Sequence, residues 1–106
     1  MKYLRLEEVT ERFGITPADL EMLEREELIA VKRTLDDEPV ISCDDVDTAR
    51  LVLLLMNELE VNLAGAEVIA HMRSEMLAMR RQFGKILEAL VAELRATLGH
   101  SPPGEH

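Results

Sequence analysis

The feature that most constrains this chain is a regular apolar pattern in its second half. Seven apolar residues recur at alternating spacings of three and four, which is the heptad repeat of a helix that packs along one narrow stripe; they are Ile69, Met72, Met76, Met79, Phe83, Ile86 and Leu90. The pattern predicts one long helix from Leu63 to about Leu98, with Asn62 as its N-cap, in the segment 61–98. A stripe of this kind needs a facing helix, and a chain of 106 residues has little core of its own to supply one.

We therefore expect a homodimer through this long helix. The alternative is that the stripe folds back onto the N-terminal part of the same chain. Beyond Leu90 a strict heptad would turn Glu93 inward, and the apolar set shifts instead to Leu87, Val91, Leu94 and Leu98, so the far end should pack differently. Gly84 lies within the helix at a cost of about 1 kcal/mol relative to Ala, which is consistent with the close approach of a partner.

Two short helices are predicted at the start of the chain. Leu6, Val9 and Phe13 recur at helical spacing and stop at Gly14, a residue suited to the left-handed conformation that ends a helix. Thr16 and Pro17 then form a new helix start, followed by Leu20, Leu23 and Leu28 as its inward face. Two short helices joined by a tight turn make a helix-turn-helix.

The next segment predicts a wing and a third helix. Residues 28–41 are rich in β-branched side chains at both ends and hold Asp36, Asp37, Glu38 and Pro39 in the middle, as in a small two-stranded wing. Ser42 is expected to cap a buried third helix with Asp45 as its partner three residues on; its apolar residues are Val46, Ala49, Val52, Leu53, Met56 and Leu59. The predicted fold class is all-α, with a winged helix-turn-helix head over 1–60, a long helix over 61–98 and a disordered tail over 99–106.

The charge of the chain is concentrated in its first 60 residues. These contain 16 acidic and 7 basic residues, against 5 and 5 in the remainder, and the whole chain carries a formal charge of −9. An acidic surface repels phosphate groups and attracts basic protein surfaces. We therefore expect a basic protein partner and no binding of duplex DNA.

Several other classes of function lack the residues they need. The longest apolar run, from Leu51 to Met56, is far too short to cross a membrane, and the single cysteine, Cys43, fits a cytoplasmic protein. No cofactor fingerprint or catalytic spacing is present, so we expect neither enzyme activity nor a cofactor. Glu67, His71 and Glu75 share one helical face and could hold a metal, although we expect a solvated, ion-pairing face and no metal site.

Two sequence motifs between Tyr3 and His71 resemble the winged-helix head of MerR-type regulators. The segment from Glu24 to Ile29 is similar to that family's Glu-Arg-x-Gly-Leu-Ile, and Val61 to Gly65 is similar to its Gly-Val-x-Leu. DNA-binding members carry an Arg-Tyr-Tyr triplet that reaches phosphates, where this chain has Glu21, Met22 and Leu23. Their Gly-Tyr-Arg wing tip corresponds here to about Asp37, Glu38 and Pro39. The contacts expected to hold DNA are thus absent or reversed in charge.

A MerR-like head without its basic residues, followed by Asn-Leu-Ala-Gly and a helix, is similar to the CbpM family of chaperone modulators. That resemblance implies binding to the J-domain of a DnaJ-like co-chaperone of the CbpA type, and inhibition of the stimulation that it gives to DnaK. The expected contact residues are Asp19, Glu21, Met22, Glu24, Asp36, Asp37 and Glu38. The alternatives are a MerR-like DNA-binding transcriptional regulator and, for the acids, an ordinary solvated helix face.

Overall fold

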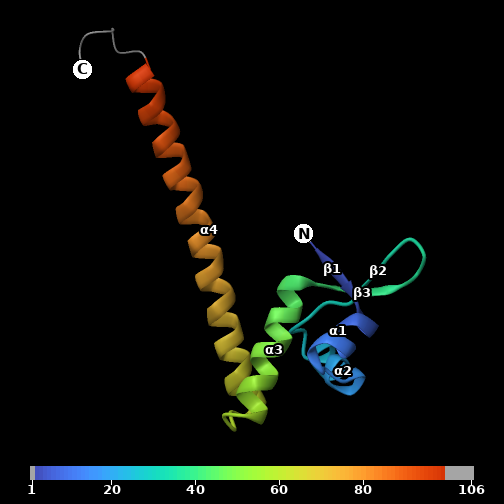
Figure 1. The fold of residues 1–106 in the computed structure, drawn as a ribbon. Helices are drawn as coiled ribbons and strands as arrows, with labels where there is room; N and C mark the ends of the chain where they lie inside the picture. Colours follow the sequence, from blue (N-terminus) through green and yellow to red (C-terminus); the bar gives the residue numbers. More distant parts are fainter. Residues whose placement is uncertain (1, 100–106) are drawn as a thin grey trace. The chain divides into compact units, whose positions relative to one another are not determined.

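The structure, a computed structural model, describes residues 2–99 and is mostly helical (Figure 1). The described residues form four helices and one three-stranded antiparallel sheet. In chain order the elements are β1 (Tyr3–Arg5), α1 (Leu6–Phe13), α2 (Pro17–Arg25), β2 (Lys32–Arg33), β3 (Pro39–Ser42), α3 (Cys43–Asn57) and α4 (Leu63–Gly99). Two compact units divide between Ala70 and His71, within α4. We call residues 2–70 the head unit and residues 71–99 the helical unit.

The turn between α1 and α2 has the local structure that its sequence predicts. Gly14 adopts a left-handed conformation with φ of 69°, and its backbone N–H donates to the carbonyl of Thr10. The Thr16 hydroxyl accepts from the Asp19 backbone N–H at 3.1 Å, the Asp19 carboxylate accepts from the Thr16 N–H at 3.3 Å, and Pro17 begins α2. The expected end of the first helix and the expected start of the second are both confirmed.

The sheet has one strand more than the two-stranded wing expected from the sequence. Its strand order is β1-β3-β2, and β3 pairs antiparallel with both neighbours. Leu4 of β1 lies opposite the fully buried Ile41 of β3. On β1 and β2, the Lys32 ammonium lies 5.7 Å from the centre of the Tyr3 ring. A three-residue strand with a single inward side chain is too short to show a periodic pattern, which explains why β1 was missed.

Helix α3 is capped as expected at its start but not in the expected reciprocal manner. The Ser42 hydroxyl accepts from the Asp45 backbone N–H at 3.1 Å. The Asp45 carboxylate accepts instead from the backbone N–H of Ala30 at 3.0 Å, and so joins the segment before β2 to the start of α3. The helix ends at Asn57, so Leu59 lies beyond it and is exposed rather than buried.

The core of the head unit brings together all of its elements except β2. Leu23, Ile41, Val9 and Val52 are its largest fully buried side chains. The remaining buried members of this cluster are Ile15, Leu20, Ile29, Val46, Ala49, Leu55, Ala66 and Ala70. Because Ala66 and Ala70 belong to α4, the first turns of the long helix are part of the head unit, and the boundary lies after Ala70 and not at residue 60.

Two glutamates end helices in a conformation that normally favours glycine. Glu27, after α2, has φ of 60°, and Glu60, after α3, has φ of 55°. In each case the next residue closes the helix end, because the Leu28 N–H donates to the Leu23 carbonyl and the Val61 N–H donates to the Leu55 carbonyl, both at 2.9 Å. The Leu28 bond, together with the bond from the Glu27 N–H to the Glu24 carbonyl, forms a Schellman motif, whose left-handed position is most often glycine. The Val61 bond spans one position more and closes the end of α3 in a wider turn.

Helix α4 begins where the sequence predicts. The Asn62 side-chain oxygen accepts from the Gly65 backbone N–H at 2.8 Å, which satisfies one free donor of the first turn. The helix continues through Gly99, which was expected to begin the tail. Residues 100–106, the rest of that predicted tail, lie outside the described residues. Within residues 2–99 there is no helix with enough length and apolar character to cross a membrane.

Candidate partner-binding surface

The acidic residues predicted on α2 divide into two groups. Glu21 and Glu24 are exposed, as a partner contact requires. Asp19 is half-buried and accepts the hydrogen bond from Thr16, so its carboxylate serves the helix cap. Met22 is half-buried and packs against the core, which leaves little of it for a partner. The exposed acids of α2 are therefore the stronger candidates for contact.

The turn between β2 and β3 places its three acids at the surface. Asp36, Asp37 and Glu38 are all exposed. Thr34 closes the turn by accepting from the Asp37 N–H at 2.9 Å, and Asp37 has φ of 62°. The Arg33 guanidinium lies 3.6 Å from the Asp37 carboxylate and donates to the Asp37 carbonyl at 3.0 Å. Asp37 is thus already partnered by Arg33, which leaves Asp36 and Glu38 as the freer charges.

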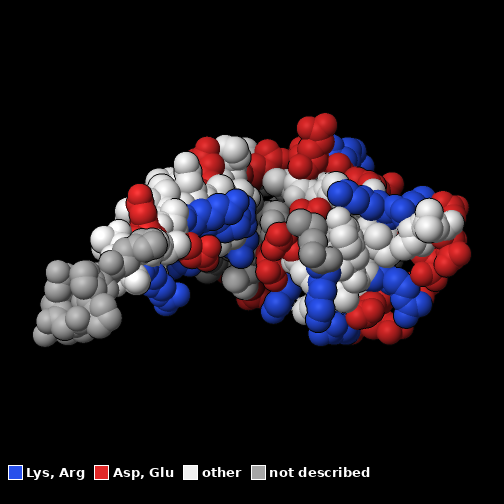
Figure 2. Space-filling view, turned by 90° about the horizontal axis from the view of Figure 1, so that it is seen from above, with Lys and Arg blue, Asp and Glu red and all other residues white. Residues whose placement is uncertain are grey.

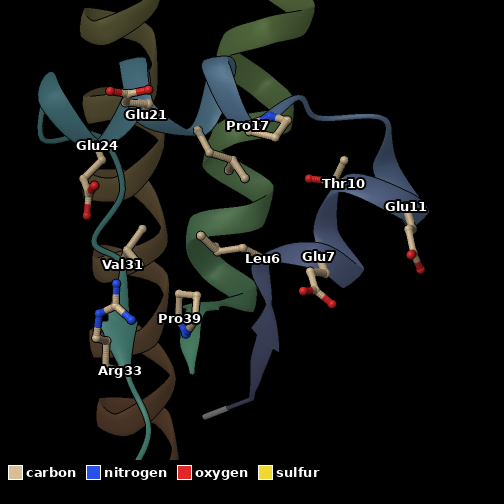
Figure 3. Close-up of a pocket in the computed structure, with 11 residues that line it drawn as sticks. Leu6, Glu7, Thr10, Glu11, Pro17, Glu21, Glu24, Val31, Arg33 and Pro39 are labelled. Carbon is tan, nitrogen blue, oxygen red and sulfur yellow. The ribbon is translucent and has the colours of Figure 1, made fainter. Parts of the chain in front are cut away.

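A groove on the head unit collects acids that the sequence did not single out (Figure 3). It has a volume of about 490 Å³ and lies between α1, α2 and the strands β2 and β3. Its apolar lining consists of Leu6, Pro17, Leu20, Val31 and Pro39, and its acidic lining consists of Glu7, Glu11, Glu21 and Glu24. Thr10 and Arg33 complete it. The groove brings Glu21 and Glu24 together with Glu7 and Glu11, but it does not include Asp19, Met22 or the acids of the turn.

Glu7 and Glu11 were missed because they were considered only as members of a short helix. Their spacing of four places both side chains on one face of α1, and both are exposed. That spacing was a signal available in the sequence. What the sequence did not give is the position of this face beside α2, which depends on the turn at Gly14 and on packing around Val9 and Leu20.

The basic residues of the head unit do not form one patch. On the face drawn in Figure 2, Lys and Arg side chains lie in separate places between acidic and uncharged ones. Arg12 and Arg50 both lie over the Phe13 ring, at 5.2 and 4.9 Å from its centre, and Arg12 also pairs with Glu8 at 3.3 Å. A duplex binder concentrates many cations along one face, whereas this cluster brings together two arginines, one of which is paired with a glutamate.

The predicted dimerisation stripe is exposed along its whole length. Its seven members, Ile69 to Leu90, are between 38% and 68% exposed in the single chain. The second apolar set, Leu87, Val91, Leu94 and Leu98, is exposed as well. Gly84 has no neighbouring atom within 4 Å of the position that a Cβ would take, so nothing in residues 2–99 of the chain explains a glycine there.

The three residues considered as a metal site have other partners. His71 Nε2 lies 3.1 Å from the Glu75 carboxylate, as expected for an ion-pairing face. Partial burial raises the pKa of Glu67 above its ordinary value, and a hydrogen bond with Glu26 and the charge of Glu26 raise it further. Within residues 2–99 no three His, Cys, Asp or Glu side chains are grouped so that they could bind a metal ion.

Comparisons of this chain with protein-family models, with curated proteins and with solved structures find no match.

Proposed function

We propose that this protein is a chaperone modulator similar to the CbpM family, which binds the J-domain of a DnaJ-like co-chaperone and inhibits its stimulation of DnaK. The observation that carries the proposal is the group of exposed acids on α2 and the β2–β3 turn. The family resemblance implies a partner that presents a basic helix to DnaK, and an acidic surface is its electrostatic complement.

The local geometry of the head unit supports the MerR-like part of the resemblance. Two short helices joined at Gly14 and followed by a strand pair are the elements of a winged helix-turn-helix. The family motifs place glycine where this chain has Glu27 and, before Val61, Glu60. Both glutamates adopt the left-handed conformation that glycine favours, so the backbone requirement of those motifs is present without the glycine.

The proposed mechanism is occlusion. The acids of α2 and of the β2–β3 turn cover the basic helix of the J-domain, which is then unable to reach DnaK. Exposed ion pairs contribute only about 0 to 1 kcal/mol each, so binding requires several acids together. It should therefore weaken steeply as the salt concentration rises.

The test of this function is inhibition of J-domain-stimulated ATP hydrolysis by DnaK. Combining Glu21→Lys, Glu24→Lys and Asp36→Lys should abolish inhibition while helical content stays unchanged. The control is Asp44→Lys with Glu58→Lys, which reverses exposed acids of α3 and its C-cap and should still inhibit. Undiminished inhibition by the triple variant would remove these acids as the binding surface.

We also propose a homodimer in which a second copy covers the apolar stripe of α4. Contiguous exposed apolar surface of this extent marks an interaction site. Phe83→Glu should give a monomer in sedimentation equilibrium, whereas Lys85→Glu, a charge change off the stripe, should leave the dimer intact. A wild-type protein that is monomeric at micromolar concentration would contradict the proposal.

A further inference from the structure

The groove between α1, α2 and the strands combines two kinds of surface (Figure 3). Leu6, Val31 and Pro39 give it an apolar floor, contributed by α1, by the residue that precedes β2 and by β3. Four acidic side chains line the groove around that floor: Glu7 and Glu11 from α1, and Glu21 and Glu24 from α2. None of these four carboxylates forms an ion pair with another residue of the range 2–99. The single basic residue of the lining, Arg33, is bound to Asp37.

This combination selects a particular kind of ligand. An apolar floor gives favourable burial only to apolar side chains, and unpaired carboxylates around it favour cations close to those side chains. An amphipathic helix with apolar residues one turn apart and Lys or Arg beside them presents both groups on one face. Nucleic acid presents the wrong charge.

The strand edge beside the groove argues against an extended peptide. A peptide that adds to a sheet needs a row of free backbone groups to pair with. Strand β2 is only two residues long, Lys32–Arg33, and its neighbour in the sheet is already β3. Such a short edge offers too few backbone hydrogen bonds to hold an added strand, whereas the two helices and the strand leave an apolar trough between them.

We infer that this groove binds a positively charged amphipathic helix, with apolar side chains on its floor and with Glu7, Glu11, Glu21 and Glu24 as the contacts to Lys and Arg. The inference deepens the proposed function and rests on it for the identity of the natural partner. It differs by making α1 part of the binding surface, and by giving the groove a larger role than the acids of the β2–β3 turn.

The probe is a synthetic helical peptide of about five turns, with Leu at positions i, i+4 and i+7 and Lys around them. Isothermal titration calorimetry should detect binding to the full chain that weakens with salt. Glu7→Gln with Glu11→Gln should lower affinity about tenfold, the effect of roughly two exposed charge pairs. Asp44→Asn with Asp47→Asn makes the same charge change on α3 and should alter affinity less than about twofold.

Two changed peptides test the floor and the helical form without altering the protein. Replacing the Leu residues by Ala should abolish binding, because the apolar contacts are lost. A central proline, which breaks the helix, should do the same. Equal binding of the proline peptide would overturn the helical mode in favour of an extended one. No binding of the original peptide, or equal loss in the α1 and α3 variants, would overturn the groove as the site.

The same variants separate this inference from the proposed function. If a purified J-domain does not bind but the peptide binds through Glu7 and Glu11, the co-chaperone assignment fails and the groove stands. If the J-domain is bound and inhibited equally by the wild type and the Glu7→Gln, Glu11→Gln variant, the groove is overturned and the proposed function stands.

Discussion

Glu60 occupies a backbone conformation that costs a residue with a side chain about 1 kcal/mol and costs glycine almost nothing. We expect Glu60→Gly to raise the free energy of unfolding, by up to about 1 kcal/mol, because relief of this cost outweighs the greater freedom of glycine in the unfolded chain. Urea unfolding followed by circular dichroism measures the change.

Glu58 supplies the matched control for Glu60. It lies two positions earlier and has φ of −99°, which any residue adopts without strain. Glu58→Gly should therefore lower stability, since only the unfolded-state entropy changes. The same sign for both substitutions would show that the left-handed conformation at residue 60 is not strained.

The raised pKa of Glu67 makes a prediction about pH. A carboxyl group with a higher pKa in the folded state binds its proton more tightly there, so its contribution to stability is present at low pH. That contribution is lost as the pH rises from the ordinary value near 4.5 through the raised folded value. Glu67→Gln should therefore stabilise the protein at pH 7 and flatten the dependence of its unfolding free energy on pH over that window.

Glu75→Gln is the comparison for Glu67→Gln. Glu75 lies on the same helix but is exposed and pairs with His71, so its removal should give no stabilisation at pH 7. A Glu67→Gln variant that is less stable than the wild type at pH 7 would show that neither the burial of Glu67 nor its proximity to Glu26 disfavours the charged carboxylate in solution.

At the residue scale the sequence predicted contacts that span few positions. The caps at Gly14, Thr16, Ser42 and Asn62 are confirmed because each joins groups within four positions, and their residue types alone favour them. The hydrogen bond from the Ala30 N–H to Asp45 joins groups fifteen positions apart. Such a contact forms only when the tertiary fold brings the two segments together, and the types of the two residues do not predict that.

At the scale of elements, periodicity located the helices well and the sheet poorly. The spacing of apolar residues predicted α1, α2, α3 and α4, with differences only at their ends. Strand β1 is held by pairing with β3, whose register places Tyr3 opposite Ser42. Its formation depends on a neighbour some forty positions away, and no local pattern of three residues reports that.

The apolar pattern of α4 also predicts the direction of the proposed helix pairing. Met72, Met76, Met79 and Phe83 are spaced four, three and four apart, and so are Leu87, Val91, Leu94 and Leu98. The two sets lie at equal distances on either side of residue 85. An antiparallel pair centred there places each residue of one set opposite its counterpart in the second copy.

Charge favours the same direction. The acidic part of each chain precedes α4, so parallel helices would bring two negatively charged head units to the same end. Residues 71–99 span roughly 40 Å at about 1.5 Å per residue, and an antiparallel pair uses this length to separate the head units. That separation exceeds the Debye length of about 8 Å at physiological salt several times over. We therefore expect antiparallel helices.

Disulfide trapping tests this direction. In a Cys43→Ser background, a mixture of Met79→Cys and Val91→Cys chains should form a cross-linked heterodimer on oxidation. Neither variant alone should cross-link efficiently, because disulfides require Cα atoms within about 7 Å. Efficient cross-linking of Met79→Cys chains with each other would instead indicate parallel helices.

At the scale of the whole molecule, we expect no useful affinity for duplex DNA near physiological salt. Specific duplex binders neutralise on the order of 6 to 10 phosphates from one face. In the head unit only Arg12 and Arg50 come together, at Phe13; Arg12 is paired with Glu8 there, and Arg33 is bound to Asp37. Electrophoretic retardation measures this directly, and sequence-specific retention would support the regulator that the sequence left as an alternative.

The negative charge of the candidate binding surface could be predicted from the sequence, but the shape of that surface could not. The number of acidic residues and their positions along the chain were sufficient to indicate an acidic N-terminal part, and Glu21 and Glu24 are among its exposed groups. The groove exists only because α1, α2 and β2 meet, so Leu6 and Val31 become neighbours of the acids through tertiary packing. Asp19 and Met22 were assigned to a partner from the family resemblance and from their place on the second helix, and packing within the head unit occupies both.

The position of Tyr3 in β1 has a practical consequence for spectroscopy. The chain has no tryptophan and one tyrosine, and that tyrosine lies in β1, in the head unit. Its fluorescence therefore reports on the head unit alone, whereas the helical ellipticity also includes residues 71–99 of α4, the helical unit. If a second copy stabilises the helical unit, dilution should move the part of the ellipticity change that comes from residues 71–99 to lower temperature and leave the tyrosine transition in place. Two optical signals from one sample then distinguish association from folding of the head unit.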